Sequence, residues 1–172
     1  MNQKRFRDYT SRSSEFFGLN LGFGIFPDEI IKNPTQKWRY SINIGVLLGY
    51  KVFLFTNHFG LRLYGDANLT FGNFAPLMVD YGLNFEMLVN FIAKYNIDFG
   101  GFVGVRVGGL SAFSPNLTEL NPALNAGLRV NIAKHYGVEI MLRTAIKDSQ
   151  LLQMRKFSHF SGNLRILYNF DK

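Results

Sequence analysis

The stretch that decides the fold is the last one, Phe160-Ser161-Gly162-Asn163-Leu164-Arg165-Ile166-Leu167-Tyr168-Asn169-Phe170, after which the chain has two more residues. Every second residue from Phe160 to Phe170 is apolar, aromatic or glycine, and the intervening set carries most of the polar residues. Because side chains of a β-strand alternate between its faces, the stretch predicts a strand with one apolar and one polar face. Aromatic residues stand at both ends of the apolar face, where they suit a membrane–water boundary. The stretch is typical of a strand in a transmembrane β-barrel.

The same alternation runs through most of the chain. A second clear case is 38–50, where Trp38, Tyr40 and Tyr50 stand at the ends of an apolar face with aliphatic residues between them. The alternation predicts eight strands, at about 16–26, 38–50, 59–71, 79–92, 97–108, 122–133, 138–146 and 160–170. An even number of antiparallel strands can close as an up-and-down barrel without free edges. We therefore predict an all-β, eight-stranded antiparallel transmembrane barrel.

Composition is compatible with this fold. The 172 residues are 47% hydrophobic, with a mean hydropathy of +0.01, and no window approaches the roughly 18 consecutive apolar residues of a spanning helix. Aromatic residues make up 16% of the chain, with 18 Phe and 8 Tyr against one Trp. The absence of cysteine excludes disulfides and thiolate metal sites, and three scattered histidines do not predict a metal site. We expect no metal and no cofactor.

The formal net charge is +7. A concentrated basic patch would favour nucleic acid or an anionic surface as the partner. Here the basic residues are dispersed along the predicted strands, which favours a barrel interior, so nucleic acid is not an expected partner.

Residues 1–14 are polar and basic and are predicted to be a tail, with the barrel over 15–170. No apolar stretch of a signal peptide follows the basic start. Since an exported protein needs one, we expect a processed or truncated chain, or a misassigned start.

The predicted connections alternate in length. Those at 55–58, 93–96 and 133–136 are short, whereas those at 27–37, 72–78, 112–121 and 147–153 are mostly longer. Short turns on one side and longer loops on the other are typical of outer-membrane barrels with both termini in the periplasm. The segment 112–121, with Phe113, Pro115 and Leu117, is the best candidate for an exposed contact surface.

The polar faces of the strands carry charges of both signs. An eight-stranded barrel has an interior just wide enough for side chains to fill, and enclosed charges must pair. We predict a lumen network of salt bridges and hydrogen bonds; the alternative is a charged, water-filled permeation path. The network is predicted to contain Arg39, Arg62, Asp66, Glu86, Asp98, Arg106, Arg129, Glu139, Arg143 and Arg165.

The apolar faces are predicted to contact outer-membrane lipid and lipopolysaccharide. The aromatic residues expected at the membrane interfaces are Trp38, Tyr40, Tyr50, Tyr81, Phe160, Tyr168 and Phe170.

Three stretches, together with the aromatic end at Tyr168 and Phe170, resemble the Helicobacter outer-membrane proteins, a family of Hop-, Hof- and Hor-type members that includes adhesins and porins. They are His58–Gly65 (HFGLRLYG), Tyr81–Ile92 (YGLNFEMLVNFI) and Asn125–Glu139 (NAGLRVNIAKHYGVE). The resemblance covers most of 15–170 and implies an outer-membrane barrel whose last strand is recognised by the barrel-assembly machinery. Family adhesins insert a large extracellular domain that binds host receptors, and this chain has no room for one, so receptor binding is not carried over. Asp171 and Lys172 also follow the aromatic with which family chains usually end.

One motif resembles a catalytic site. His159-Phe160-Ser161 is similar to the His-x-Ser arrangement of outer-membrane lipid A deacylases, in which a His would activate a Ser nucleophile. The only acidic residue after Ser161 is Asp171, and strand parity directs His159 and Ser161 into the barrel, away from a lipid substrate. We therefore predict no enzymatic activity and no catalytic residues.

The sequence favours an integral outer-membrane barrel with a structural or surface-interaction role and a filled lumen. The alternatives are a narrow porin, a lipid A-modifying hydrolase, and a soluble lipocalin-like carrier with the apolar face inside. The sequence does not identify a ligand or a host receptor.

Overall fold

The structure, a computed structural model, describes residues 12–27, 38–54, 57–72, 77–94, 96–113, 116–146 and 160–170. Among these residues there is no helix with the length and apolar character needed to cross a bilayer. The strands are β1 (Ser14–Pro27), β2 (Trp38–Phe53), β3 (Phe59–Gly72), β4 (Met78–Ala93), β5 (Ile97–Phe113), β6 (Asn116–Leu120), β7 (Ala123–Ile132), β8 (Tyr136–Ala145) and β9 (Phe160–Asn169).

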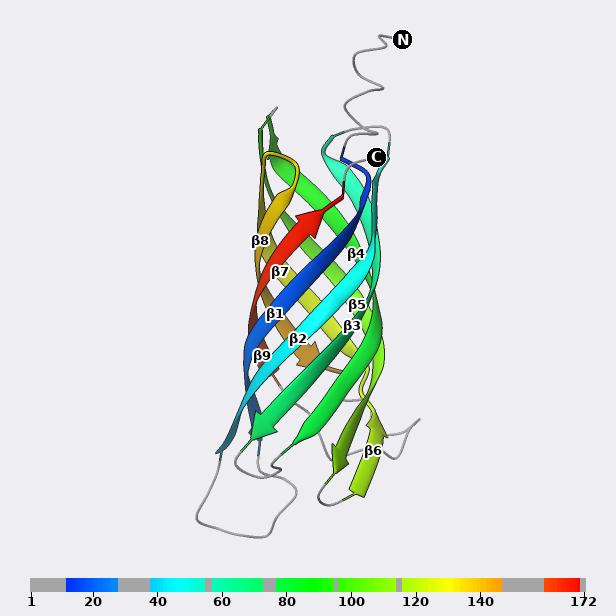
Figure 1. Cartoon of the computed structure of the whole chain (residues 1–172), viewed down its shortest axis with the longest axis vertical. Coiled ribbons are helices and arrows are strands. Elements are labelled where there is room, and N and C mark those ends of the chain that lie inside the picture. The colour runs from blue at the N-terminus through cyan, green and yellow to red at the C-terminus, as the bar shows by residue number, and fades with distance from the viewer. Residues whose placement is uncertain are drawn as a thin grey trace.

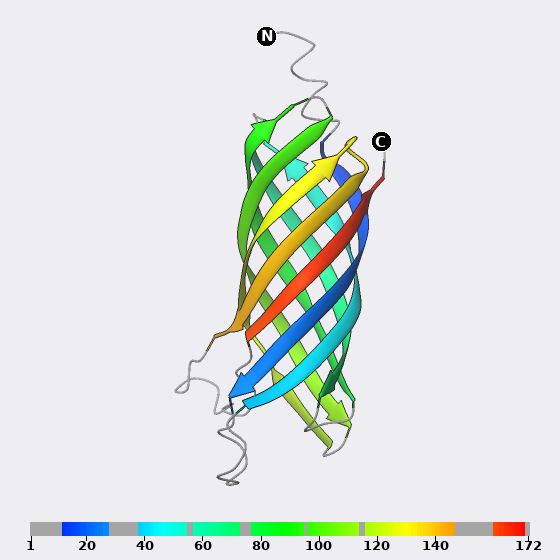
Figure 2. The same cartoon turned by 90° about the vertical axis from the view of Figure 1, so that its left-hand side faces the viewer.

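These strands form one closed antiparallel sheet (Figures 1 and 2). Strands that are neighbours in sequence pair with each other, except β6 and β7, and β1 pairs with β9. β5 pairs with β4 on one side and with both β6 and β7 on the other. Since β6 and β7 share one place, the order around the barrel is β1, β2, β3, β4, β5, β7, β8, β9, a ring of eight. The predicted eight-stranded barrel is confirmed.

The segment 112–121 was predicted to be a loop, and this is wrong. β5 extends to Phe113 and pairs with β6 from Gly109↔Leu120 to Phe113↔Asn116, so a hairpin prolongs the wall beyond the neighbouring strands (Figure 1). Asn121 and Pro122 separate β6 from β7, because proline has no backbone N–H to donate to a ladder. The Asn121 N–H still donates to the Gly108 carbonyl at 2.8 Å, which keeps the two segments in one wall.

The boundary of the predicted tail also needs correction. β1 begins at Ser14, and Arg12 is buried at 6% exposure, so the barrel starts earlier than residue 15. The Ser13 hydroxyl accepts a hydrogen bond from the Phe53 N–H at 3.0 Å, which ties this segment to the end of β2. Residues 1–11 lie outside the described part of the chain.

Burial is inverted relative to a soluble protein. Among the described residues, 25 buried side chains are polar or charged and 11 are hydrophobic, whereas Leu48 and Leu83 are 63% and 65% exposed. Along β8 exposed positions alternate with buried or half-buried ones, and β9 follows the same pattern except that Gly162, on the outward face, is half-buried. The apolar face is therefore outside, which contradicts the lipocalin-like alternative, because such a carrier needs an apolar interior.

Because the apolar belt faces outward, the stability lost on introducing a charged residue should depend on the position of that residue along the barrel axis. Val46 lies midway along β2 with 46% exposure, and we expect Val46→Arg to reduce the free energy of unfolding in lipid vesicles by about 2–4 kcal/mol. Thr144→Arg, at an exposed site near the end of β8, should cost about 0–1 kcal/mol. Urea titrations of both variants measure the difference, and equal small losses would contradict a lipid-facing belt.

Candidate functional site

The candidate site is the charged interior. Of the ten residues predicted for the lumen network, nine are buried and none of the nine exceeds 8% exposure. The tenth, Arg39, lies in β2, but its side chain is outside what the structure describes. Side chains alternate between the two faces of a strand, and each of these nine lies an odd number of positions from a residue whose apolar side chain is exposed. The nine side chains therefore point into the barrel.

The first cluster, which we call the Glu86–Glu139 quartet, consists of Arg62, Arg165, Glu86 and Glu139. Arg62 donates to Glu86 through Nε at 2.9 Å and pairs closely with it through Nη2, while its Nη1 and Nη2 donate to the two Glu139 oxygens at 2.6 and 3.0 Å. Arg165 completes the quartet at 3.6 Å from Glu86 and 3.7 Å from Glu139. Two positive and two negative charges therefore balance.

Aromatic rings enclose this quartet. The Arg62 guanidinium carbon lies 5.0–5.5 Å from the ring centroids of Phe16, Tyr64 and Phe102. The Tyr64 hydroxyl donates to Glu86 at 2.5 Å. Packing of rings around a paired guanidinium adds cation–π attraction and excludes water from the ion pairs.

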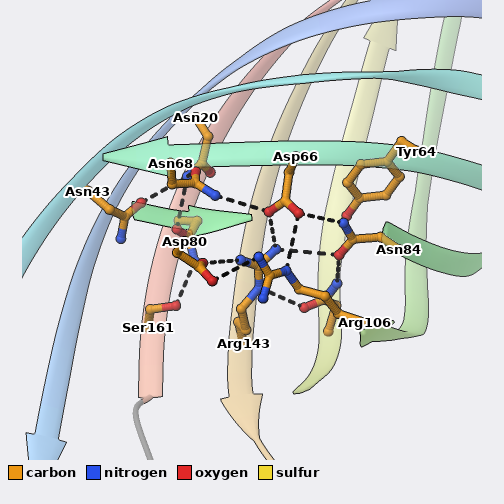
Figure 3. Close-up of polar contacts among 12 residues, drawn as sticks. Asn20, Asn43, Tyr64, Asp66, Asn68, Asp80, Asn84, Arg106, Arg143 and Ser161 are labelled. Atoms are coloured by element: carbon orange, nitrogen blue, oxygen red, sulfur yellow. Dashed lines mark hydrogen bonds and ion pairs between the residues drawn. The ribbon is translucent and has the colours of Figure 1, made fainter. Parts of the chain in front are cut away.

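A second cluster, the Asp66–Asp80 quartet, consists of Arg106, Arg143, Asp66 and Asp80 and is drawn in Figure 3. Arg106 reaches Asp66 at 3.1 Å and Asp80 at 2.9 Å, and Arg143 reaches the same two carboxylates at 3.0 and 3.4 Å. Asn84 donates at 2.9 Å to Asp66 Oδ1, the oxygen that also accepts from Arg106. Again two arginines share two carboxylates, so the cluster is neutral.

A third pair closes the end of the lumen at which β1 begins. Arg12 Nε lies 3.1 Å from Asp98 Oδ1, and Arg12 Nη2 donates to the Lys94 carbonyl at 3.0 Å. These contacts of Arg12 connect the segment just before β1 to the start of β5.

The ion pairs cross the barrel. In the ring of eight, β3 stands four places from β8, and so do β4 from β9 and β1 from β5. The contacts Arg62–Glu139, Arg165–Glu86 and Arg12–Asp98 therefore join opposite walls. The Arg143–Asp66 contact also joins β8 to β3. Side chains that meet from opposite walls occupy the lumen at their level.

The remaining interior is also occupied. Phe16, Leu47, Tyr64 and Leu167 form one buried apolar cluster, and Phe53, Leu88, Phe102 and Met141 form another. Beside Asp80 and Arg143 there is a cavity of about 10 Å³, room for about one water molecule.

Glycine makes space for the quartet. An added Cβ at Gly104 would lie 2.5 Å from Cγ of Glu86 and 2.2 Å from the Phe85 carbonyl oxygen. Because real Cβ atoms do not approach so closely, a larger residue here would displace Glu86 or the neighbouring strand.

Sequence reasoning missed Arg12, Lys51, Asp80 and Tyr64 as members of the filled interior. Lys51 and Asp80 have the parity of the lumen face, and extending the second predicted strand by one residue would have included Lys51. Tyr64 shares the parity of Arg62 and Asp66 in its strand but was not included in the predicted network. Arg12 carried no signal, because its strand begins after it.

The predicted interface aromatics lie on the outer wall at both ends of the barrel. Tyr50 and Tyr168 pair with Glu15 and Phe17 near the start of β1, and Phe160 pairs with Ile25 near its end. Exposure is 37–51% for Tyr40, Tyr50, Tyr81, Phe160, Tyr168 and Phe170. The Trp38 side chain lies outside the described residues.

The His159-Phe160-Ser161 motif is described only in part. Ser161 is 2% exposed inside the lumen, where its hydroxyl accepts a hydrogen bond from Asn163 at 3.0 Å, and His159 lies outside the described residues. Within the ranges that the structure covers, His, Asp and Glu are not grouped in threes that could hold a metal ion.

Solved structures with this fold are outer-membrane barrels. The attachment invasion locus protein Ail of Yersinia pestis is 16% identical, with a TM-score of 0.54 over 92% of this chain and 97% of that one. Neisserial surface protein A is 10% identical, with a TM-score of 0.60 over 92% and 99%. The outer membrane enzyme PagL is 15% identical, with a TM-score of 0.56 over 88% and 99%. Together with the inverted burial, the fold defines an integral outer-membrane β-barrel protein.

A family comparison is more specific. The family model described as Helicobacter outer membrane protein matches residues 45–170, and the chain belongs to that family. No curated protein sequence matches the chain significantly. The protein is therefore a bacterial outer-membrane barrel protein, and because the structural neighbours include both a surface protein and an enzyme, the fold alone does not assign its role.

The Glu86–Glu139 quartet predicts a measurable coupling. Arg62→Met leaves two buried carboxylates with only the more distant Arg165, and we expect a loss of about 3–5 kcal/mol in the free energy of unfolding. Adding Glu139→Gln should cost less than the sum of the two single changes, with a coupling of about 0.5–3 kcal/mol.

Guanidinium titrations of the refolded barrel give the complete double-mutant cycle. Leu63→Met, on the adjacent outward-facing position with 57% exposure, is the matched control and should change stability little. Additive effects of Arg62→Met and Glu139→Gln would contradict the ion pair across the lumen.

Proposed function

We propose that this protein is a non-conducting outer-membrane barrel that acts as a structural or surface-presenting scaffold rather than as a pore or an enzyme. The observation that carries the proposal is the set of ion pairs between opposite walls, above all Arg62–Glu139 and Arg143–Asp66. A solute would have to break these pairs to pass, and each carboxylate would then lose its partner in a confined interior. That cost, several kcal/mol per ion, opposes permeation.

An enzymatic role is disfavoured by the position of Ser161. Its hydroxyl faces the lumen beside Asn163, whereas an acyl-chain substrate would lie against the outer wall. A nucleophile needs access to its substrate as well as a base, and the lumen supplies neither lipid nor room.

We further propose that both termini face the periplasm. β1 begins and β9 ends at one end of the barrel, where the described turn Ala133–His135 is short (Figure 1). The connections 28–37 and 146–159 are longer and belong to the other end, which we place at the cell surface.

The outer wall would meet three partners in this orientation. Tyr81 and Phe160 would lie at the level of lipopolysaccharide, and Tyr168 and Phe170 at the periplasmic interface. Tyr168 and Phe170, which are exposed at the end of β9, would also be available to the barrel-assembly machinery.

Planar-bilayer recording tests the filled lumen. Reconstituted protein should give no stable unitary conductance, because the quartets occupy the lumen. Arg62→Ala combined with Glu139→Ala, which removes a contact across it, should give larger or more frequent openings. Reproducible unitary currents from the unmodified protein would instead support the narrow-porin alternative.

Antibody labelling of intact cells tests the orientation. An epitope tag inserted within 147–159 should be labelled on intact cells, whereas the same tag in the Ala133–His135 turn should be labelled only after permeabilisation. The reverse pattern would place the termini outside.

A further inference from the structure

The buried charges of the barrel do not balance. The described residues include seven buried basic side chains and five buried acidic ones. The two quartets use four of each, and the Arg12–Asp98 pair uses one more of each. Two basic residues, Lys51 and Arg129, remain without a carboxylate at ion-pair distance among the described residues.

These two side chains project from opposite walls. Lys51 lies on β2 and Arg129 on β7, four places apart in the ring of eight, and their exposures are 5% and 1%. The positive charge of Arg62 repels both side chains, and that of Arg129 also repels Lys51. The nearby carboxylates, Glu139 and Asp98, already have arginine partners.

Arg129 lacks acceptors, among the described residues, for two of its hydrogen-bond donors. Its Nε and Nη2 atoms are buried without a hydrogen-bond partner, and its guanidinium carbon lies 5.5 Å from the Phe53 ring centroid. A buried guanidinium that stacks on a ring but leaves N–H donors unused lacks an acceptor. Lys51, with 5% exposure, supplies a second buried cation.

We propose that Lys51 and Arg129 bind one small inorganic anion, such as a halide or phosphate, in the lumen. An anion between them offsets one or both of the two positive charges and accepts the unused Arg129 donors, which suit an oxyanion or a halide. Lys51 pairs with Ser14 at the start of β1, and Arg129 lies close to the end of β7, so the site is near the terminal end of the lumen. Lys51 is the cross-strand partner of Arg62, and Arg129 is that of Glu139, so the site borders the Glu86–Glu139 quartet.

Anion-dependent unfolding tests the site. The full chain is refolded in a zwitterionic detergent, and its melting temperature is measured in sodium gluconate, sodium bromide and sodium phosphate at constant ionic strength. Bromide or phosphate should raise the melting temperature in a saturable way, because an anion that binds only the folded state stabilises it. The identity of the more effective anion distinguishes a halide from an oxyanion.

Two variants make the result specific. Lys51→Met combined with Arg129→Met should abolish the anion-dependent rise while leaving the protein as stable in gluconate as the parent or more so, since two unpaired buried cations are removed. Lys94→Met, at an exposed position, is the matched control and should keep the full rise. An equal rise in the double variant would overturn the proposal.

A carboxylate of the chain itself is the competing anion, and Asp8 is the one acidic residue of the segment 1–11 that precedes the described residues. Stabilisation by bromide that appears only in Asp8→Asn would show that the chain fills its own site and would overturn the proposal. Anomalous diffraction from bromide-soaked crystals should show a peak between Lys51 and Arg129. Its absence at bromide concentrations that give the full stabilisation would contradict this location.

Discussion

The interior of this barrel depends on pairing charges across a narrow lumen. Eight strands enclose a space that only side chains fill, and charges placed there lose most of their hydration. Arg62 meets Glu139, and Arg143 meets Asp66, from walls four places apart. Each contact satisfies two buried ions at once and fixes the distance between opposite strands. The same contacts that stabilise the closed ring therefore also obstruct it.

The outer wall has the opposite chemistry because of the period-two alternation. Each strand presents its apolar residues to the surroundings and its charged or amide residues to the lumen, so one sequence pattern satisfies two different solvents. Small residues such as Gly104 leave room for long ones such as Glu86. Family membership and fold agree with this division.

The period-two alternation predicted well which face of its strand a residue occupies. It did not predict the position of that residue along the barrel axis or the residue with which it pairs. Arg62 and Glu139 could be assigned to the interior from their own strands, whereas their meeting depends on the stagger of strands around the whole ring, which no single strand encodes. The β5–β6 hairpin was missed because Pro115 and Pro122 made 112–121 resemble an irregular loop. The role of Arg12 was missed because a residue before a strand has no parity to read.

Thiol accessibility tests the filled lumen most directly, because the chain contains no cysteine. Asn84 is buried near the middle of β4 with 0% exposure, and Asn84→Cys gives the protein a single thiol. In vesicles or whole cells the folded variant should not react with a small charged thiol reagent, and it should react fully after unfolding. Rapid labelling of the folded barrel would show an open, hydrated passage and would contradict a lumen filled by paired side chains.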